Sequence, residues 1–419
     1  MSRSFVLNKK RPLSLFEGFG VEMEYMIADS ETLNILPISD NVLEQKAGSI
    51  VSEISAGNMA WSNELVLHVI EIKTDGAAMD LGSLAPAFQE QVSDINSILE
   101  THNALLMPGA IHPWMDPFTE VKLWPHEYNP IYETYNRIFD CRGHGWANLQ
   151  STHLNLPFNG DEEFGKLHAA SRLILPLIPS LAASSPIADG ERKPFLDYRM
   201  EKYRTNSLRI PSITGKIVPE PVFTKDDYDR EIFRRMYRDI SEFDPEGILQ
   251  DEWLNSRGAM SRWDRQTIEI RVIDIQECPA ADIAILEWIV NLTRSLVEEK
   301  WISFEDQKNW SEIDLYELLM AVVKDGEEAV ITNKNYLSMF GLSETSMKAG
   351  ELCETIYNHL APDYLFSIGS KKHLDLIFRE GPLGRRILSA LPEKFSREDL
   401  YFVYANLSDC LKHGKAFEI

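Results

Sequence analysis

The chain of 419 residues has 44% hydrophobic and 26% charged residues and a formal net charge of −23 at pH 7. This composition can bury a large core and is typical of a soluble globular protein. The acidic balance argues against a protein that binds nucleic acid or an anionic membrane surface, because those proteins need basic patches. Small anionic substrates remain possible, since an acidic surface can surround a basic pocket.

The sequence has no run of about 18 apolar residues, so no membrane partner is expected. Its first 18 residues lack the apolar centre of a signal peptide. The four cysteines are scattered and show neither a disulfide framework nor CxxC metal spacing. We therefore expect a cytoplasmic protein with reduced thiols.

Strand-like and helix-like segments alternate irregularly along the chain. The predicted strands, rich in β-branched and aromatic residues, are 17–29, 64–73, 148–156 and 267–275. The predicted helices are 86–106, 226–242 and 165–183, the last kinked or split by Pro176 and Pro179. Residues 203–224 are predicted to be a functional loop, and the pattern beyond about residue 281 is mainly helical.

This order of elements predicts an α+β protein with a mostly antiparallel sheet and flanking helices. The strict βαβ alternation of a Rossmann fold is absent, as is any GxGxxG or GxxxxGK[ST] phosphate loop. No repeat or low-complexity linker interrupts the chain. We expect a single domain over residues 14–419, with a sheet-bearing core at 14–300 and a helical C-terminal portion at 301–419.

The first predicted strand places two carboxylates in an apolar run, GFGVEMEYMI at residues 18–27. Glu22 and Glu24 are two positions apart, so both project from the same face of the strand. Buried carboxylates held close together repel each other and need a counter-charge or a metal ion.

Two further strands offer acceptors. Glu64 and Glu71 lie at opposite parity, so they reach one face only if a bulge or twist intervenes. Glu64 could equally be a surface residue at the start of the strand. The third strand carries Ser151, His153 and Asn155 on one face, although a lone histidine in a strand is more often structural.

The last predicted strand, TIEIRVIDI, carries Glu269 and Arg271 on one face and only apolar residues opposite. A cross-strand surface ion pair would give the same pattern. The apolar opposite face favours a polar face that lines a cavity instead.

The acceptors on these four strands suit Mg²⁺ or Mn²⁺, which prefer hard oxygen ligands. Arginines complement them: Arg199, Arg204 and Arg209 in DYRMEKYRTNSLRIP, and Arg271. Arginine binds phosphate or carboxylate bidentately and keeps its charge. The set predicts a site for a metal–nucleotide complex and an acidic co-substrate; structural ion pairs are the alternative.

The motifs that carry these residues resemble those of glutamate–cysteine ligases, above all the type-2 group of carboxylate–amine ligases. In chain order they are GVEMEY, ELVLHVIEIKT, GAIHPW, STHLNL, LPLIPSLAASSP, YRTNSLRIP and TIEIRVIDI. The likeness spans about residues 17–300, and only REGPLGRRIL supports it in the C-terminal third.

The resemblance implies a glutamine-synthetase-like fold, in which the concave face of a curved, mostly antiparallel sheet holds ATP and divalent metals. The metal ligands that it implies are Glu22, Glu24, Glu64, Glu71, His153 and Glu269. It also implies that Arg209 and Arg271 are catalytic and hold phosphate or substrate carboxylate, and we expect Arg199, Arg204 and Asn155 to bind substrate or ATP.

Two departures put the amine acceptor in doubt. Many type-2 members have His-x-His where this chain has His153 and Asn155. They also tend to have three consecutive acidic residues where this chain has Glu22, Met23 and Glu24.

The implied activity is an ATP- and Mg²⁺-dependent ligation that forms an amide through an acyl phosphate. The expected partners are small molecules. They are glutamate, which reacts through its γ-carboxylate, and cysteine or another amine, as in glutathione biosynthesis. The alternatives are a non-catalytic member that binds nucleotide or metal, and a two-carboxylate glycoside hydrolase. A homo-oligomer is left open.

Overall fold

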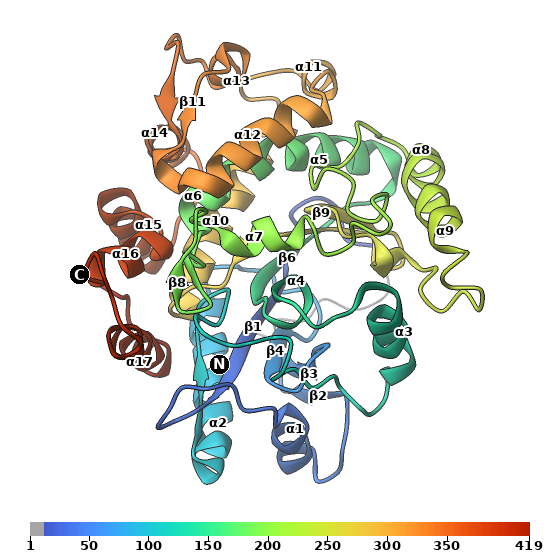
Figure 1. The fold of residues 1–419 in the computed structure, drawn as a ribbon. Helices are drawn as coiled ribbons and strands as arrows, with labels where there is room; N and C mark the ends of the chain where they lie inside the picture. The colour runs from blue at the N-terminus through green and yellow to red at the C-terminus, as the bar shows by residue number, and fades with distance from the viewer. Residues whose placement is uncertain (1–11) are drawn as a thin grey trace.

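An eight-stranded sheet, antiparallel at every pairing, lies at the centre of the computed structural model, which describes residues 12–419 (Figure 1). The strand order is β2-β3-β4-β1-β6-β10-β9, and β5 pairs with the C-terminal half of β1. The strands are β1 Gly20–Asp29, β2 Glu53–Ala56, β3 Met59–Asn63, β4 Val69–Thr74, β5 Ala104–Met107, β6 Ser151–Pro157, β9 Ala259–Arg262 and β10 Thr267–Asp274. Two further two-stranded sheets are the hairpin of β7 Ile187–Ala188 with β8 Glu191–Arg192, and β11 Val330–Ile331 with β12 Met347–Lys348.

Helices surround the sheet and make up most of the C-terminal third. The α-helices are α1 Ser39–Ala47, α2 Leu84–Leu99, α3 Asn129–Phe139, α4 His144–Ala147, α5 Gly160–Ile174, α6 Pro179–Ala182, α7 Tyr198–Tyr203, α8 Lys225–Tyr228, α9 Arg234–Ile240, α10 Pro279–Val297, α11 Phe304–Lys308, α12 Glu312–Asp325, α13 Lys334–Met339, α14 Ala349–Leu360, α15 Ile368–Glu380, α16 Leu383–Ala390 and α17 Arg397–His413. Short 3₁₀ segments are η1 Glu100–His102, η2 Leu175–Leu177, η4 Glu252–Leu254 and η5 Gly326–Glu328, and η3 Asp229–Phe233 is a π-helical turn between α8 and α9.

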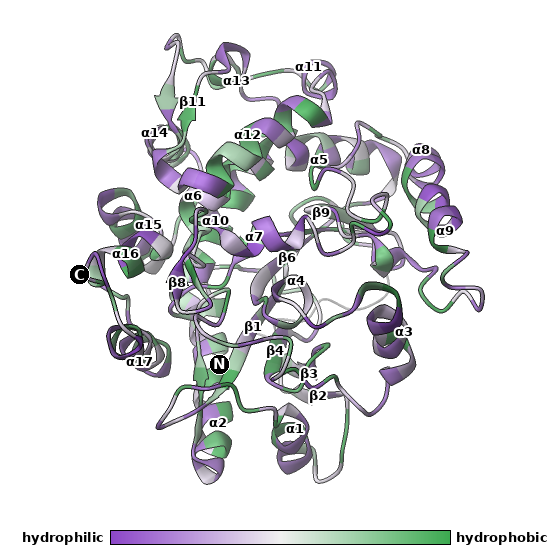
Figure 2. Cartoon of the chain, viewed as in Figure 1, coloured by the Kyte–Doolittle hydropathy of each residue, from purple (hydrophilic) through white to green (hydrophobic). Residues whose placement is uncertain are grey.

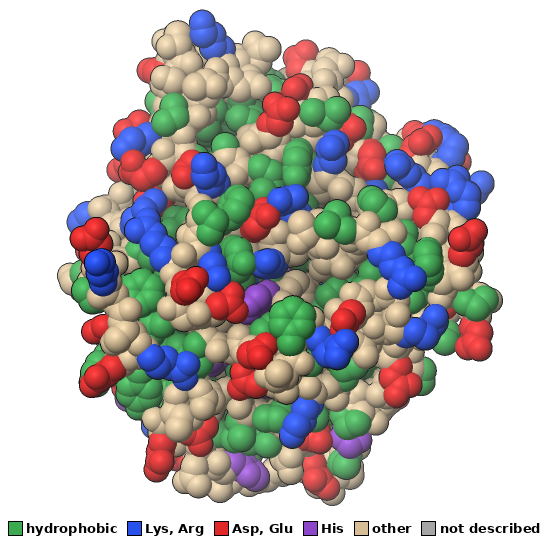
Figure 3. All heavy atoms as spheres, in the orientation of Figure 1, with side chains coloured by type: hydrophobic (Ala, Val, Ile, Leu, Met, Phe, Trp, Pro, Cys, Tyr) green, Lys and Arg blue, Asp and Glu red, His purple; other side chains and the backbone are tan. Residues whose placement is uncertain are grey.

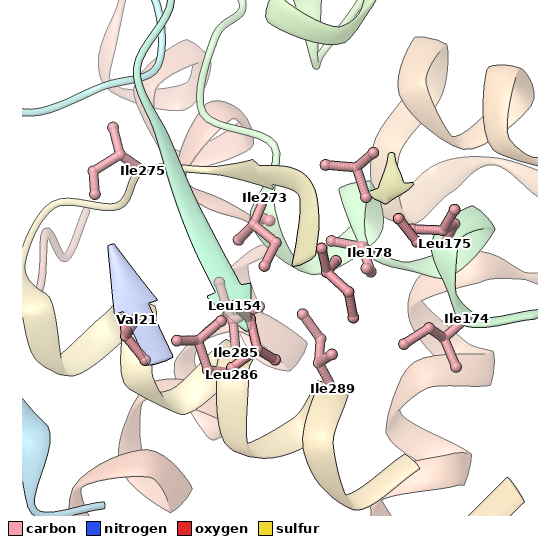
Figure 4. Close-up of a cluster of buried hydrophobic side chains, with 14 of the residues drawn as sticks. Val21, Leu154, Ile174, Leu175, Ile178, Ile273, Ile275, Ile285, Leu286 and Ile289 are labelled. Atoms are coloured by element: carbon pink, nitrogen blue, oxygen red, sulfur yellow. The ribbon is translucent and has the colours of Figure 1, made fainter. Parts of the chain in front are cut away.

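One face of the sheet is apolar and packs against the long buried helix α10. Val21 of β1 and Leu154 of β6 lie among Ile285, Leu286 and Ile289 of that helix (Figure 4). All five are fully buried, and burying each such side chain stabilises the fold by about 1.5–3 kcal/mol. Figure 2 shows hydrophobic residues along α10, whereas α8 and α9 at the rim are mostly hydrophilic.

The C-terminal helices share this core. A single hydrophobic cluster includes residues from Phe19 to Leu411. Helix α15 packs on α10, and α17 packs on β5 and α2. The helical C-terminal portion therefore contacts the sheet-bearing part directly.

The predicted strands at 17–29, 148–156 and 267–275 are confirmed as β1, β6 and β10. The strand predicted at 64–73 begins only at Val69, and Glu64 lies in the loop before it. The opposite parity of Glu64 and Glu71 therefore needs no bulge. The turn that ends this loop is closed by the Val69 N–H, which donates to the Val66 carbonyl.

Two predicted helices also differ in extent. The helix predicted at 86–106 ends at Leu99, because Asn103 adopts a left-handed conformation (φ 54°) and the chain reverses into β5. The helix predicted at 165–183 is split at its prolines into α5, η2 and α6, as expected. The segment predicted at 226–242 contains the π-helical turn.

All four cysteines are unpaired and buried, which confirms the expectation of free thiols. Burial raises the pKa of Cys141 and Cys353 to about 12, and that of Cys410 to about 11. Within residues 12–419 no helix is long and apolar enough to cross a membrane. The segment for which no signal peptide is expected lies mostly outside the described residues.

Candidate active site

The second face of the sheet is polar, and its register gathers the predicted carboxylates. Glu22 of β1 lies opposite His153 of β6 on one side and Lys73 of β4 on the other. Glu24 lies opposite Glu71 of β4. Directly opposed residues of antiparallel strands project from the same face, so these side chains meet.

His153 connects the two carboxylates of β1. Its Nδ1 lies 3.0 Å from Glu22 Oε2, and its Nε2 lies 3.0 Å from Ser151 Oγ. The Ser151 hydroxyl and backbone N–H both donate to Glu24 Oε2, at 3.1 and 2.8 Å. Asn155 Nδ2 donates to Glu22 Oε1 at 3.3 Å. Hydrogen bonds thus fix the orientation of both carboxylates and of the imidazole ring.

Two groups of side chains in the described part of the chain could each hold a metal ion. One is Glu22, His153 and Glu269; the other is Glu24, Glu71 and His153. In each group the ligand atoms all lie within 4.8 Å of one another, and His153 belongs to both. Carboxylate oxygens with one imidazole fit Mg²⁺ or Mn²⁺. Glu64 belongs to neither group.

The electrostatics of these side chains indicate a missing positive charge. Burial alone would raise the pKa of Glu22, but the hydrogen bond and charge of His153 lower it to about 2. Burial lowers the pKa of His153, but Glu22 and Glu24 raise it above its usual value. Burial and the neighbouring carboxylates raise the pKa of Glu71 and, more strongly, of Glu64. The carboxylates outnumber the cations that neutralise them, so the site suits a divalent cation.

Lys73 is a residue of this site that the sequence interpretation missed. Its Nζ lies 3.1 Å from Glu71 Oε1 and 2.8 Å from Glu53 Oε2. Ser62 Oγ donates to the same oxygen of Glu71 at 2.6 Å. Lys73 is two positions after Glu71 on one strand, and that parity alone would have placed it on the polar face.

Arg271 lies at a β-bulge in β10, which sets the direction of its side chain. Ile270 pairs with Leu154 and Ile273 with Thr152, so Arg271 and Val272 together lie across from His153 alone. Arg271 Nε lies 3.1 Å from Glu269 Oε1, an ion pair without hydrogen-bond geometry.

Arg199 lies beneath Arg271 and is fully buried. Its Nε donates to Asp274, and its Nη2 donates to the Arg271 carbonyl at 3.3 Å. Asp274 also accepts from the Ser184 N–H and the Ser185 hydroxyl, both at 2.8 Å. Arg199 is therefore held as part of the buried framework.

The other two predicted arginines are placed differently. Arg204 forms a bidentate pair with Glu201 on α7, at 2.6 and 2.7 Å. Arg209 Nη1 donates to the Ile138 carbonyl at 2.7 Å, and its guanidinium stacks 4.4 Å from the ring centroid of Phe243. Neither lines the cavity beside the carboxylates.

A cavity of about 220 Å³ adjoins the carboxylate face. Its polar lining includes Glu24, Glu64, Ser151, His153, Arg199 and Arg271. Its other side is aromatic, from Tyr132, Tyr135, Trp146, Tyr203 and Trp253. By contrast, Trp61 and Trp124 are fully buried core residues. The aromatic side was not predicted, because its residues come from separate parts of the chain.

The outer surface has charges of both signs. Figure 3 shows acidic and basic side chains interspersed over this face, with the densest basic group over α8 and α9. The arginines there are paired with local acids, such as Arg230 with Asp227 and Arg234 with Asp229.

Comparison with protein families gives a match to glutamate–cysteine ligase family 2 over residues 18–323. An uncharacterized protein of Archaeoglobus fulgidus is 31% identical over 398 residues, which cover 95% of this chain and 99% of the relative. A protein of Bradyrhizobium sp. strain ORS 278, provisionally named glutamate–cysteine ligase 2, is 24% identical over 299 residues. That alignment covers 69% of this chain but only 63% of the relative.

Among solved structures, the glutamate–cysteine ligase of Francisella tularensis in complex with AMP superposes with a TM-score of 0.65 at 9% identity, over 96% of this chain and 90% of that one. A bifunctional glutathione synthetase of Pasteurella multocida gives a TM-score of 0.55 at 11% identity, over 95% of this chain and 53% of that one. These likenesses concern the fold alone. The predicted α+β class with a mostly antiparallel, glutamine-synthetase-like sheet is confirmed.

Proposed function

The chain belongs to glutamate–cysteine ligase family 2, and on that premise we propose that it is an ATP-dependent carboxylate–amine ligase. The resemblance inferred from the motifs of the sequence is thereby confirmed. The proposed donor is the glutamate γ-carboxylate, and the acceptor is cysteine or another amine. The proposed catalytic unit is the single domain over residues 14–419, acting in the cytoplasm on small molecules.

The observation that carries this proposal is the convergence of carboxylates on His153 beside a cavity that contains Arg271. A carboxylate is a poor acyl donor, because its oxygen is a poor leaving group. Transfer of the γ-phosphoryl group of ATP to the donor carboxylate gives an acyl phosphate that an amine can attack. The protein contributes positioning and neutralisation of charge, and it needs no covalent nucleophile.

Each group of side chains has a distinct role. Glu22 with Glu269, and Glu24 with Glu71, would hold divalent cations on either side of His153. When bound, Mg²⁺ would supply the positive charge that the phosphates require during transfer. Arg271 is placed to bind a substrate carboxylate or the transferred phosphoryl group, because its fork of donors faces the cavity.

The test is ADP release by the purified chain with ATP, Mg²⁺, glutamate and a broad panel of amines and amino acids. Glu24→Gln and Arg271→Ala should each lower turnover by at least about 100-fold while circular dichroism stays unchanged. Glu90→Gln, at an exposed position on α2, is the matched control and should keep full activity. Near-normal turnover of both site variants would contradict the assignment of Glu24 and Arg271 to the active site. No ADP release with any acceptor would remove the ligase proposal.

A non-catalytic member of the same family is the second candidate. It would bind ATP through the same side chains, and the assay separates the two: nucleotide binding without ADP release under any condition favours it. The glycoside-hydrolase alternative has no comparable support, since the family match concerns ligases.

A further inference from the structure

The aromatic side of the cavity is a built surface. Besides Tyr203, it consists of Tyr132, Tyr135, Trp146 and Trp253, and these four residues are here called the aromatic wall. The ring centroid of Tyr135 lies 5.2 Å from that of Trp146 and 5.9 Å from that of Trp253. Rings at such separations attract one another, so these three rings pack together.

Hydrogen bonds fix the polar edges of the aromatic wall. Trp146 Nε1 donates to the Asn206 carbonyl at 3.1 Å. The Tyr132 hydroxyl accepts from Asn63 Nδ2 at 2.9 Å. These two bonds hold the rings of Trp146 and Tyr132 in place beside the cavity.

The size of the cavity favours a small occupant. Its volume of about 220 Å³ lies below the roughly 300–1,000 Å³ typical of sites for drug-sized ligands. It suits a molecule of amino-acid size.

The charges of the lining limit how many carboxylates the cavity accepts. Three lining side chains can be cationic: Arg199, Arg271 and His153. Arg199 is bound to Asp274, and His153 to Glu22. Arg271 is ion-paired with Glu269, but its Nε has no hydrogen-bond partner, so among the described lining residues it is the remaining cation with a donor free for a substrate anion.

A glutamate donor uses that remaining cation. It carries two carboxylates, of which one reacts and the other needs a cationic partner. An amino-acid acceptor would add a third carboxylate, for which the described lining offers no further cation. A buried carboxylate without a partner is strongly disfavoured.

We propose that the acceptor is a primary amine that lacks a carboxylate and carries an aromatic side chain, an arylalkylamine, with its ring on the aromatic wall. This inference rests on the proposed ligase function and names the substrate class of the same site. The amine nitrogen attacks the carbonyl carbon of the acyl phosphate and forms the C–N bond. The C–O bond to phosphate breaks, phosphate leaves with the electron pair, and the attacking nitrogen loses one proton to the departing phosphate.

The experiment compares matched acceptors in the ADP-release assay with the full chain, ATP, Mg²⁺ and glutamate. Comparing phenethylamine with phenylalanine measures the effect of a carboxylate on the acceptor. Comparing phenethylamine with ethylamine measures the effect of the aromatic ring. We expect kcat/KM for phenethylamine to exceed both by at least about tenfold, which corresponds to about 1.4 kcal/mol. Cysteine is included as the reference amino acid.

The outcomes separate the two proposals. Turnover with cysteine or phenylalanine equal to or above that with phenethylamine overturns the acceptor assignment and leaves the ligase. If turnover with ethylamine equals that with phenethylamine, the aromatic wall does not bind the acceptor's ring. No ADP release with any acceptor overturns the ligase and this inference together.

Variants of the wall provide an independent readout. Trp253→Ala should raise the KM for phenethylamine at least about tenfold, with the KM for ATP and for ethylamine unchanged. Trp253→Leu keeps more side-chain volume and should do the same if the alanine variant does not fold. Phe118→Ala, whose ring is exposed outside the cavity, is the control. An equal rise in the KM for ATP would assign the wall to the adenine ring and overturn the proposal.

Discussion

At the scale of single residues, the site depends on side chains that hold the ligating groups in place. Ser151 is the clearest case, because its hydroxyl contacts both His153 and Glu24. A residue in this position orients ligands instead of donating to the ion.

Ser151→Ala should therefore weaken Mg²⁺ binding by about 10- to 100-fold without unfolding the protein. The backbone N–H of residue 151 still donates to Glu24, so the loss should come from the imidazole and the second hydrogen bond. Isothermal titration with Mg²⁺ or Mn²⁺ measures it, and Ser93→Ala on the exposed side of α2 is the control. Unchanged affinity would show that His153 is held without the hydroxyl.

Residue parity explains which site residues could be predicted. Glu22 and Glu24, or Glu269 and Arg271, share a face through a spacing of two that is visible in one strand. Glu64 could not be placed this way, because it lies in a loop whose path depends on tertiary contacts.

At the scale of elements, strand β6 connects the site to the core. His153 and Asn155 project to the polar face, and Leu154 between them packs against α10 (Figure 4). The helix thus supports the strand that carries the imidazole.

Leu154→Ala should destabilise the protein by about 2–5 kcal/mol, because it leaves a cavity against Ile285 and Ile289. Urea unfolding at equilibrium measures the change. Leu208→Ala, at a side chain that is 63% exposed, should change the free energy of unfolding by less than about 0.5 kcal/mol. A loss below about 0.5 kcal/mol for the buried variant, as for a surface change, would mean that α10 moves to fill the cavity.

Element boundaries show where local pattern fails. Leu106 continues the helical spacing of α2, yet it belongs to β5 because the chain reverses at Asn103. The short strands β2, β3 and β9 carry too few residues for alternation to identify them, and pairing with longer strands defines them instead.

At the scale of the whole molecule, three buried histidines make stability depend on pH. Burial lowers the pKa of His68 to about 4 and those of His112 and His168 to about 3. Their unfolded value is near 6.5, so below that pH the unfolded chain binds more protons than the folded one. The contribution of these neutral histidines to stability is fully present above pH 6.5 and is lost as the pH decreases toward 4.

As the pH is lowered from 6 to 4, each of these histidines should reduce the free energy of unfolding by up to about 1.4 kcal/mol per pH unit. The free energy of unfolding, measured in urea from pH 7 to 5, should fall less steeply in His168→Gln than in the natural protein. The slope is the readout, so a lower absolute stability of the variant does not obscure it. His359→Ala, at an exposed position on α14, should leave the slope unchanged. An identical slope in His168→Gln would contradict the assignment.

The aromatic wall shows what the sequence alone could not provide. Tyr132 and Tyr135 lie on α3, Trp146 on α4 and Trp253 in η4, more than a hundred residues from the first of them. No local spacing relates these positions. They meet because the sheet and α7 bring the segments together.

The four unpaired cysteines give the native protein a further property. Their thiols are buried, and the pKa of each is raised, so almost no thiolate is present at neutral pH. A thiol-specific dye should therefore remain colourless until part of the core opens. Cys278 lies at the start of α10, Cys353 in α14 and Cys410 in α17. The order in which the dye labels them would therefore show the order in which these regions open, without any engineered probe.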